Sequence, residues 1–160
     1  MNQPEFLRET TDYFHQQIPV TREMGVVVES FGADGLVLTA PLGPNHNHLG
    51  TAFGGSLAAV ATLAGYGMLW LLLEEREAHV VIKNSSLHYH HPVTGDIRAV
   101  CHPPPTAALE TFMRNFRKKG RARLPLRVTI SEGDRICVEF SGTFVAIRQG
   151  VAALHPFISP

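Results

Sequence analysis

The stretch that decides the fold is Leu57 to Leu73, which reads LAAVATLAGYGMLWLLL and holds 17 residues without a charge. An apolar run of this kind predicts a helix that is buried on all sides. Its length is also close to the minimum that spans a bilayer, so a membrane helix is the competing interpretation. The acidic sequence that follows, EERE at residues 74–77, lacks the basic flank that marks an inner membrane face. We therefore expect a core helix and no membrane.

Strand-like segments lie on both sides of this helix. Upstream, residues 24–31 and 36–42 are joined through Gly32, Asp34 and Gly35, a turn-prone stretch. Downstream, residues 80–91 and 97–102 flank the turn PVTGD. Residues 124–131 and 136–147 are joined by Glu132, Gly133 and Asp134, which is a hairpin signal. Pro125 indicates that its strand lies at an edge or carries a bulge.

Two shorter helices complete the pattern. Residues 4–17 are amphipathic, and a second helix is expected from Thr106, a candidate N-cap, to Gly120. Hairpin-linked strands and one helix apolar enough to be wrapped predict an α+β fold, an antiparallel sheet around one long central helix. We expect a single domain over residues 1–160, with a C-terminal tail over residues 149–160.

Composition narrows the class of protein. The chain has 160 residues, 44% hydrophobic and 18% charged, with a formal net charge of +0. These values are typical of a globular domain and give no overall positive field for nucleic acid. Cys101 and Cys137 are too few for a disulfide framework, so we expect buried thiols. The N-terminal sequence lacks a secretory signal, so a cytoplasmic location is expected.

The loop before the central helix carries a recognisable motif. The sequence Asn47-His-Leu-Gly50-Thr-Ala-Phe53-Gly54-Gly55 resembles N-x-x-G-x-x-H-G-G of hotdog-fold thioesterases. Tyr89-x-x-Pro92-x-x-Gly95 resembles the strand and turn of the same fold. Over roughly residues 20 to 148, the chain is most similar to the thioesterase domain of the YiiD C-terminal type.

The resemblance implies a hotdog fold, a homodimer or a tetramer, and hydrolysis of an acyl thioester at the subunit interface. The carrier would be coenzyme A or an acyl-carrier protein, and no metal or other cofactor is implied. The chain departs from better-known members at two positions. Phe53 replaces their histidine before the glycine pair, and Thr62 replaces the acidic residue on their central helix. No carboxylate occurs between Asp34 and Glu74.

Several residues are candidates for the chemistry. Gly54 and Gly55 at a helix N-terminus can present free backbone N–H groups to an oxyanion. The alternative is that they only allow tight packing of the helix on the sheet. Asn47 can hold a water with its amide, or it can cap its own loop. Thr62 is a candidate for positioning water only. Candidate substrate contacts around this motif are Asn45, Gly50 and Phe53.

Histidines supply a further candidate. His48 is our prediction for the general base, because imidazole titrates near neutral pH, although a solvated loop histidine is the alternative. The pairs His46/His48 and His88/His90 suggest a metal, but no ligand set completes a zinc pattern. We therefore expect no metal, and we expect His88 and His90 on a sheet face.

Basic residues gather in one segment. Seven of the 14 lysines and arginines lie between Arg114 and Arg127, and no acid falls between Glu110 and Glu132. This is either a solvated helix end or a binding patch for the phosphates of coenzyme A or for an acidic carrier protein. Its candidate contacts are Arg117, Lys118, Lys119 and Arg121.

Four functions remain open from the sequence. An acyl thioesterase fits the motif best. A non-catalytic acyl-thioester-binding protein is the alternative, because of Phe53 and Thr62. A hotdog hydratase or dehydratase would need the missing carboxylate, and a metal enzyme of another fold rests on the histidines alone.

Overall fold

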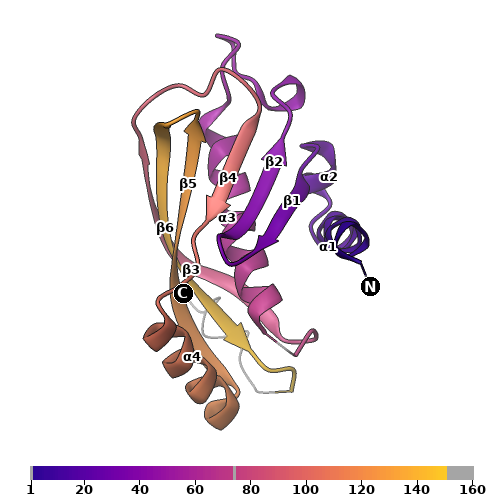
Figure 1. Cartoon of the computed structure of the whole chain (residues 1–160), viewed down its shortest axis with the longest axis vertical. Coiled ribbons are helices and arrows are strands. Elements are labelled where there is room, and N and C mark those ends of the chain that lie inside the picture. Colours follow the sequence, from indigo (N-terminus) through magenta and orange to yellow (C-terminus); the bar gives the residue numbers. More distant parts are fainter. Residues whose placement is uncertain (1, 74, 151–160) are drawn as a thin grey trace, which may run out of the picture.

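A computed structural model of the chain describes residues 2–73 and 75–150. In this part, six strands form one antiparallel sheet in the order β1-β2-β4-β5-β6-β3 (Figure 1). In chain order the elements are α1 (Gln3–Gln17), α2 (Val20–Glu23), β1 (Val27–Gly32), β2 (Gly35–Ala40), a 3-10 turn η1 (Gly43–Asn45), α3 (Gly54–Leu72), β3 (His79–Tyr89), β4 (Ile97–Cys101), α4 (Thr106–Lys119), β5 (Arg121–Glu132) and β6 (Arg135–Ile147).

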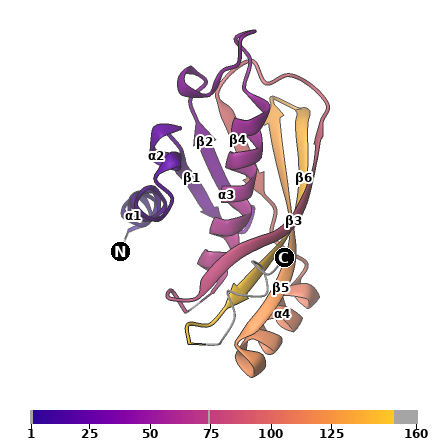
Figure 2. The same ribbon diagram turned by 180° about the vertical axis from the view of Figure 1, so that it is seen from behind.

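The central helix α3 lies across one face of this sheet, as Figure 2 shows. It contacts β2, β4, β5, β6 and β3. Two glycines allow this close approach: a methyl group at Gly65 would meet the ring of Phe144, and one at Gly67 would meet Phe14 and Leu36. The helix is long and apolar enough to span a membrane, but 61% of that stretch is buried within the fold. The predicted core helix and fold class are confirmed.

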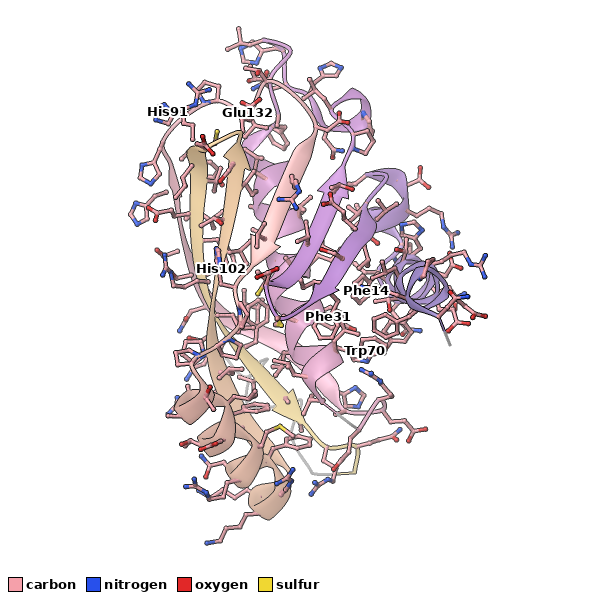
Figure 3. The ribbon with its side chains drawn as sticks, viewed as in Figure 1. Phe14, Phe31, Trp70, His91, His102 and Glu132 are labelled. Atoms are coloured by element: carbon pink, nitrogen blue, oxygen red, sulfur yellow. The ribbon has the colours of Figure 1, made fainter. Side chains whose placement is uncertain are left out.

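Aromatic rings join α1 to the second half of α3. Tyr13 stacks on Trp70 with ring centroids 4.2 Å apart, and Phe14 meets Tyr66 and Trp70 edge-on. Arg76 lies over the indole at 4.3 Å from its centroid. Figure 3 shows Phe14 and Trp70 together beside α1. The amphipathic pattern of residues 4–17 therefore predicted the helix, and its aromatic residues pack against α3.

The hairpin between β5 and β6 is also as predicted. Gly133 has a positive φ of 56° in a turn closed by the pairing of Glu132 with Arg135. Pro125 pairs with Thr143 of β6, in the half of β5 that β4 does not reach. That half of β5 has β6 on one side and no described strand on the other. A proline, which lacks an N–H, is tolerated at such an edge.

Several boundaries differ from the predictions. Thr106 is the first residue of α4 rather than its N-cap, since Pro105 holds that position without a side-chain cap. The first strand begins at Val27 rather than Met24. The short helix α2, which the sequence did not indicate, ends just before Met24. Gly120 ends α4 in the left-handed conformation, as expected. Both cysteines are free and buried. The last ten residues of the expected tail lie outside the described part of the chain.

Candidate functional site

The loop before α3 is held by the side chain of Asn47. Its amide nitrogen donates to the Thr51 hydroxyl at 2.9 Å, and its oxygen accepts from the N–H groups of Leu49 and Thr51. Gly50, at φ 75°, closes the turn by donating to the Asn47 carbonyl. In this conformation Asn47 therefore organises its own loop, which is the second of its two expected uses.

Asn45 anchors the same loop from beneath. Its side chain is 1% exposed, and its amide nitrogen donates to the carbonyls of Met24 and Pro41, each at 2.8 Å. Its backbone carbonyl accepts from the N–H of Phe53, at the N-cap of α3. Asn45 is thus buried behind the loop, where it sets the position at which the helix begins.

The first turn of α3 presents free donors. Phe53 caps the helix without a side-chain hydrogen bond. Within the described residues, the N–H groups of Gly54 and Gly55 donate to no acceptor. Such groups at the positive end of a helix dipole favour a negative charge. The hydroxyl of Tyr89 donates to the Gly54 carbonyl at 3.2 Å, so the two motifs noted in the sequence are in contact.

The space around Gly54 and Gly55 indicates whether they are needed for tight packing or are available as oxyanion donors. A methyl group at Gly54 would lie 3.7 Å from the Tyr89 ring, which is an ordinary contact. The atoms nearest to one at Gly55 would be those of the Phe53 ring, a side chain that is 57% exposed and can move. Tight packing is needed at Gly65 and Gly67, further along the helix, and not at this pair.

A mostly apolar groove of about 560 Å³ runs along α3. Ala58, Ala59, Thr62 and Tyr66 lie three, four, seven and eleven residues after Gly55, so they share its side of the helix. The opposite wall comes from β3 and β6. The lining residues are Gln17, Ile18, Val20, Thr21, Ala58, Ala59, Thr62, Leu63, Tyr66, Val80, Val81, Ile82 and Phe144. An acyl chain would find an apolar channel here.

Polar groups mark two points along the groove. One is Thr62, which the resemblance aligns with an acidic residue of better-known relatives. Tyr66 lies further along, where the groove meets a second hollow lined by Tyr13, Arg76 and other residues. Burial, with a smaller effect of Tyr13, raises the pKa of Tyr66 above its ordinary value, so its hydroxyl stays protonated. Tyr66 was missed in the sequence, where it looked like one more apolar member of the helix.

A carboxylate is absent from the described lining of the groove. Glu75 pairs with Arg148 at 2.7 Å. Glu110 lies on α4, in a separate hollow that also includes Arg114 and Arg117. Glu74, another candidate acid, lies outside the described residues.

The histidines are spread over the molecule. His48 is exposed and has no hydrogen-bond partner among the described residues. His88 and His90 stack with centroids 6.2 Å apart, and His90 pairs with Glu139 of β6 at 2.8 Å, so their expected place on a sheet face is confirmed. The described residues contain no group of three potential metal ligands.

Glutamate 132 supports the turn after β3. Glu132 accepts hydrogen bonds from the N–H groups of Thr94 and Gly95 and from the Thr94 hydroxyl. These bonds lower the pKa of its carboxyl group, chiefly through the Thr94 N–H. The carbonyl of Val93, in the same turn, accepts from the Ala52 N–H. Glu132 and His91 lie at this end of the molecule in Figure 3. The carboxylate is therefore structural.

The basic residues predicted to bind the carrier are divided between two hollows. Arg117 and Lys118 line a shallow one with Leu109, Glu110, Met113 and Arg114. Lys119 and Arg121 line another together with Lys83 and Arg123. Lys83 comes from β3, so the sequence cluster could not reveal its part in this second hollow.

The sheet wrapped on one long helix, with free donors at the helix start, defines a hotdog fold of the thioesterase kind. The family described as "Putative thioesterase (yiiD_Cterm)" matches residues 7–148, and the chain belongs to this family. A solved protein of unknown function from Chlorobaculum tepidum TLS is 33% identical, with 92% of this chain and 97% of that chain covered and a TM-score of 0.84. A putative thioesterase from Shewanella oneidensis is 28% identical, with 90% and 99% covered and a TM-score of 0.80.

A more distant relative shows that the fold itself is shared. A thioesterase from Haemophilus influenzae is 21% identical, with 89% of this chain and 90% of that chain covered and a TM-score of 0.72.

Proposed function

We propose that this protein is an enzyme that hydrolyses an acyl thioester, of coenzyme A or an acyl-carrier protein, to the free acid and the thiol. One observation carries the proposal: the N–H groups of Gly54 and Gly55 have no acceptor among the described residues and stand at the start of the same helix whose side lines the apolar groove. The thioester oxygen accepts from these N–H groups as it gains negative charge, and the acyl chain lies in the groove.

The active form is a homodimer joined through β3. This strand has eleven residues and, within the described sheet, one neighbour, β6. Long open edges are usually covered, and Val20 and Ile82, at 57% and 36% exposure, leave the groove open to solvent. A two-fold axis near Asn84, the middle of β3, would pair the strands antiparallel.

This pairing completes the site from two subunits. Antiparallel strands bring the end of β3, where Tyr89 contacts Gly54, beside the start of the partner's strand. The start of the strand carries Val80 and Val81, which line the groove. The oxyanion donors of one subunit then meet the groove and Thr62 of the other. His48 activates the water, Thr62 positions it, and Asn47 holds the loop that carries His48.

A non-catalytic acyl-thioester-binding protein is the second candidate. It is favoured by the lack of a carboxylate in the described groove lining and by the lack of an orienting partner for His48. Catalytic bases are commonly oriented by a third group. The two candidates share the groove and differ only in turnover.

Release of thiol from a panel of acyl-CoA and acyl-carrier-protein thioesters separates the candidates. The protein's own thiols interfere little, because Cys101 and Cys137 are buried and burial raises the pKa of Cys101 to about 12. Turnover with any thioester class supports the enzyme. Saturable binding of acyl-CoA without thiol release establishes the binding protein instead, and neither binding nor release refutes both.

A further inference from the structure

A hollow of about 460 Å³ beside the C-terminal end of α4 gathers positive charge from three elements. Lys119 belongs to α4, Arg121 and Arg123 to β5, and Lys83 to β3. Asn115, Ala122 and Val145 complete the lining, which contains no carboxylate in the described part of the chain. In Figure 1, α4 lies at the far end of the molecule from the loop that precedes α3.

The strand pairing explains how these side chains meet. Arg121 and Arg123 are two residues apart and lie across from Ile147 and Val145 of β6. Ala122 and Leu124, between and beyond them, are buried, so the two arginines lie on the sheet face turned away from α3. The hollow is therefore distinct from the acyl groove.

A β-bulge brings Lys83 to this group. The pairing of β3 with β6 shifts between Ile82 and Asn84, which makes Lys83 the extra residue. Bulges re-aim side chains, and they are frequent beside functional sites. Here the bulge supplies a cation to the hollow from a strand that is some 40 positions away in the sequence.

Three of the four cations that line the hollow form no ion pair within the described chain. Lys83, Lys119 and Arg123 take part in none of the ion pairs found among the described residues. Clustered like charges repel one another, and an anion with several oxygens would relieve this repulsion while accepting several charge-assisted hydrogen bonds. A chain with a net charge of +0 has no general excess of cations that would produce such a cluster.

We propose that this hollow binds the phosphate groups of a phosphorylated small molecule through Lys83, Lys119, Arg121 and Arg123. The phosphates belong either to the nucleotide end of the thioester carrier or to a free phosphate compound. The proposed phosphate binding does not depend on the proposed hydrolysis. Only the first source, the nucleotide end of the thioester carrier, rests on it. Arg117 and Lys118, on the other side of α4, serve as the comparison.

Binding of adenosine 3′,5′-bisphosphate and of pyrophosphate is measured by calorimetry at low and high salt. The comparison uses two double variants that reverse equal charge: Lys119→Glu with Arg123→Glu inside the hollow, and Arg117→Glu with Lys118→Glu on the other side of α4. The first pair should weaken binding at least roughly tenfold, the effect of one lost charge-assisted hydrogen bond, and the second pair far less. Wild-type affinity should fall with salt.

Two further measurements complete the test. A Lys119→Gln, Arg123→Gln variant that melts like the wild type should show the same loss of binding, which excludes misfolding as the cause. If the phosphates belong to the carrier, the KM for acyl-CoA rises in this variant while that for acyl-pantetheine, which has no phosphate, is unchanged. If pyrophosphate binds as tightly as the nucleotide and neither KM changes, the hollow serves a free phosphate compound.

The proposal is overturned if neither phosphate probe binds the wild type saturably at low salt, or if both double variants lose the same affinity. Absence of any thioester hydrolysis would instead refute the proposed function and leave the binding result intact.

Discussion

The Tyr89 hydroxyl donates a hydrogen bond of 3.2 Å to the carbonyl oxygen of Gly54 and so joins the end of β3 to the first residue of α3. The bond fixes the orientation of the peptide groups at the helix start, whose N–H groups have no acceptor within the described chain. Since β3 is an edge strand, the contact places the candidate oxyanion donors beside the edge at which we propose that a second subunit pairs.

Removing one of these donors should slow the reaction. Proline at position 54 has no N–H, is tolerated in the first turn of a helix, and follows Phe53 in a conformation that a residue before proline adopts, φ −65° and ψ 134°. We expect Gly54→Pro to lower kcat roughly 10²–10³-fold, the usual effect of one lost oxyanion donor. Gly54→Ala keeps the N–H, has room for its methyl group, and is the control. Equal activities in the two variants would exclude this N–H from the reaction.

The general base can be tested through the pH dependence. If His48 activates the water, His48→Ala should lower turnover roughly 10²–10⁴-fold and remove an inflection from the pH–rate profile, with folding unchanged. Asn47→Ala should also lower turnover, because the loop loses the bonds of its side chain, but the inflection should remain. Unchanged turnover and profile in His48→Ala would remove this histidine from the mechanism.

The fold could be predicted because its causes are local in the sequence. The run from Leu57 to Leu73 is apolar on all sides, and the structure buries it between sheet and surrounding elements. The Glu132-Gly133-Asp134 turn predicted the hairpin of β5 and β6, because Gly133 readily adopts the positive φ that the turn requires. The helix α2 was missed, since four residues after Pro19 carry too little periodicity to be recognised.

The candidate site was only partly predictable, because its members meet through tertiary structure. Gly54 and Gly55 were found through a motif. Tyr66 was hidden within an apolar helix, and Lys83 reaches the basic hollow only because a bulge in β3 turns it there. The basic cluster in the sequence did not show that α4 divides it, with Lys118 on one side and Lys119 on the other.

Self-association should depend on β3. The wild type should sediment at micromolar concentration with at least twice the mass of one 17.6 kDa chain. Ile82→Glu places a charge near the middle of β3, at a side chain that is 36% exposed, and should shift the protein toward monomers. Val27→Glu, on β1 at the opposite edge and 45% exposed, is the matched control. Dissociation by the control alone would move the interface to β1.

Thr62 should respond to a carboxylate. Thr62→Asp introduces the acid that the resemblance implies in better-known relatives, on the groove face of α3. A carboxylate accepts a proton from water more readily than a hydroxyl does, so we expect a higher kcat in thiol-release assays. Thr62→Ala should have a mild effect. A Thr62→Asp variant that is folded, binds acyl-CoA and is no faster would show that a carboxylate at this position does not assist the reaction.

Packing of α3 on the sheet should not tolerate added volume at Gly65. A methyl group there would overlap the ring of Phe144, which is fully buried. Alanine in a helix is favoured over glycine by about 1 kcal/mol, whereas overpacking costs about 1–3 kcal/mol. We therefore expect Gly65→Ala to reduce the free energy of unfolding in urea, by up to about 2 kcal/mol at fixed protein concentration.

In a Phe144→Leu background the smaller side chain leaves room, so Gly65→Ala should be neutral or stabilising. A double-mutant cycle measures this coupling directly. Gly54→Ala, whose methyl group meets nothing closer than 3.7 Å, should show no such loss. If Gly65→Ala alone stabilises the protein, α3 does not pack on the ring of Phe144 as closely as described.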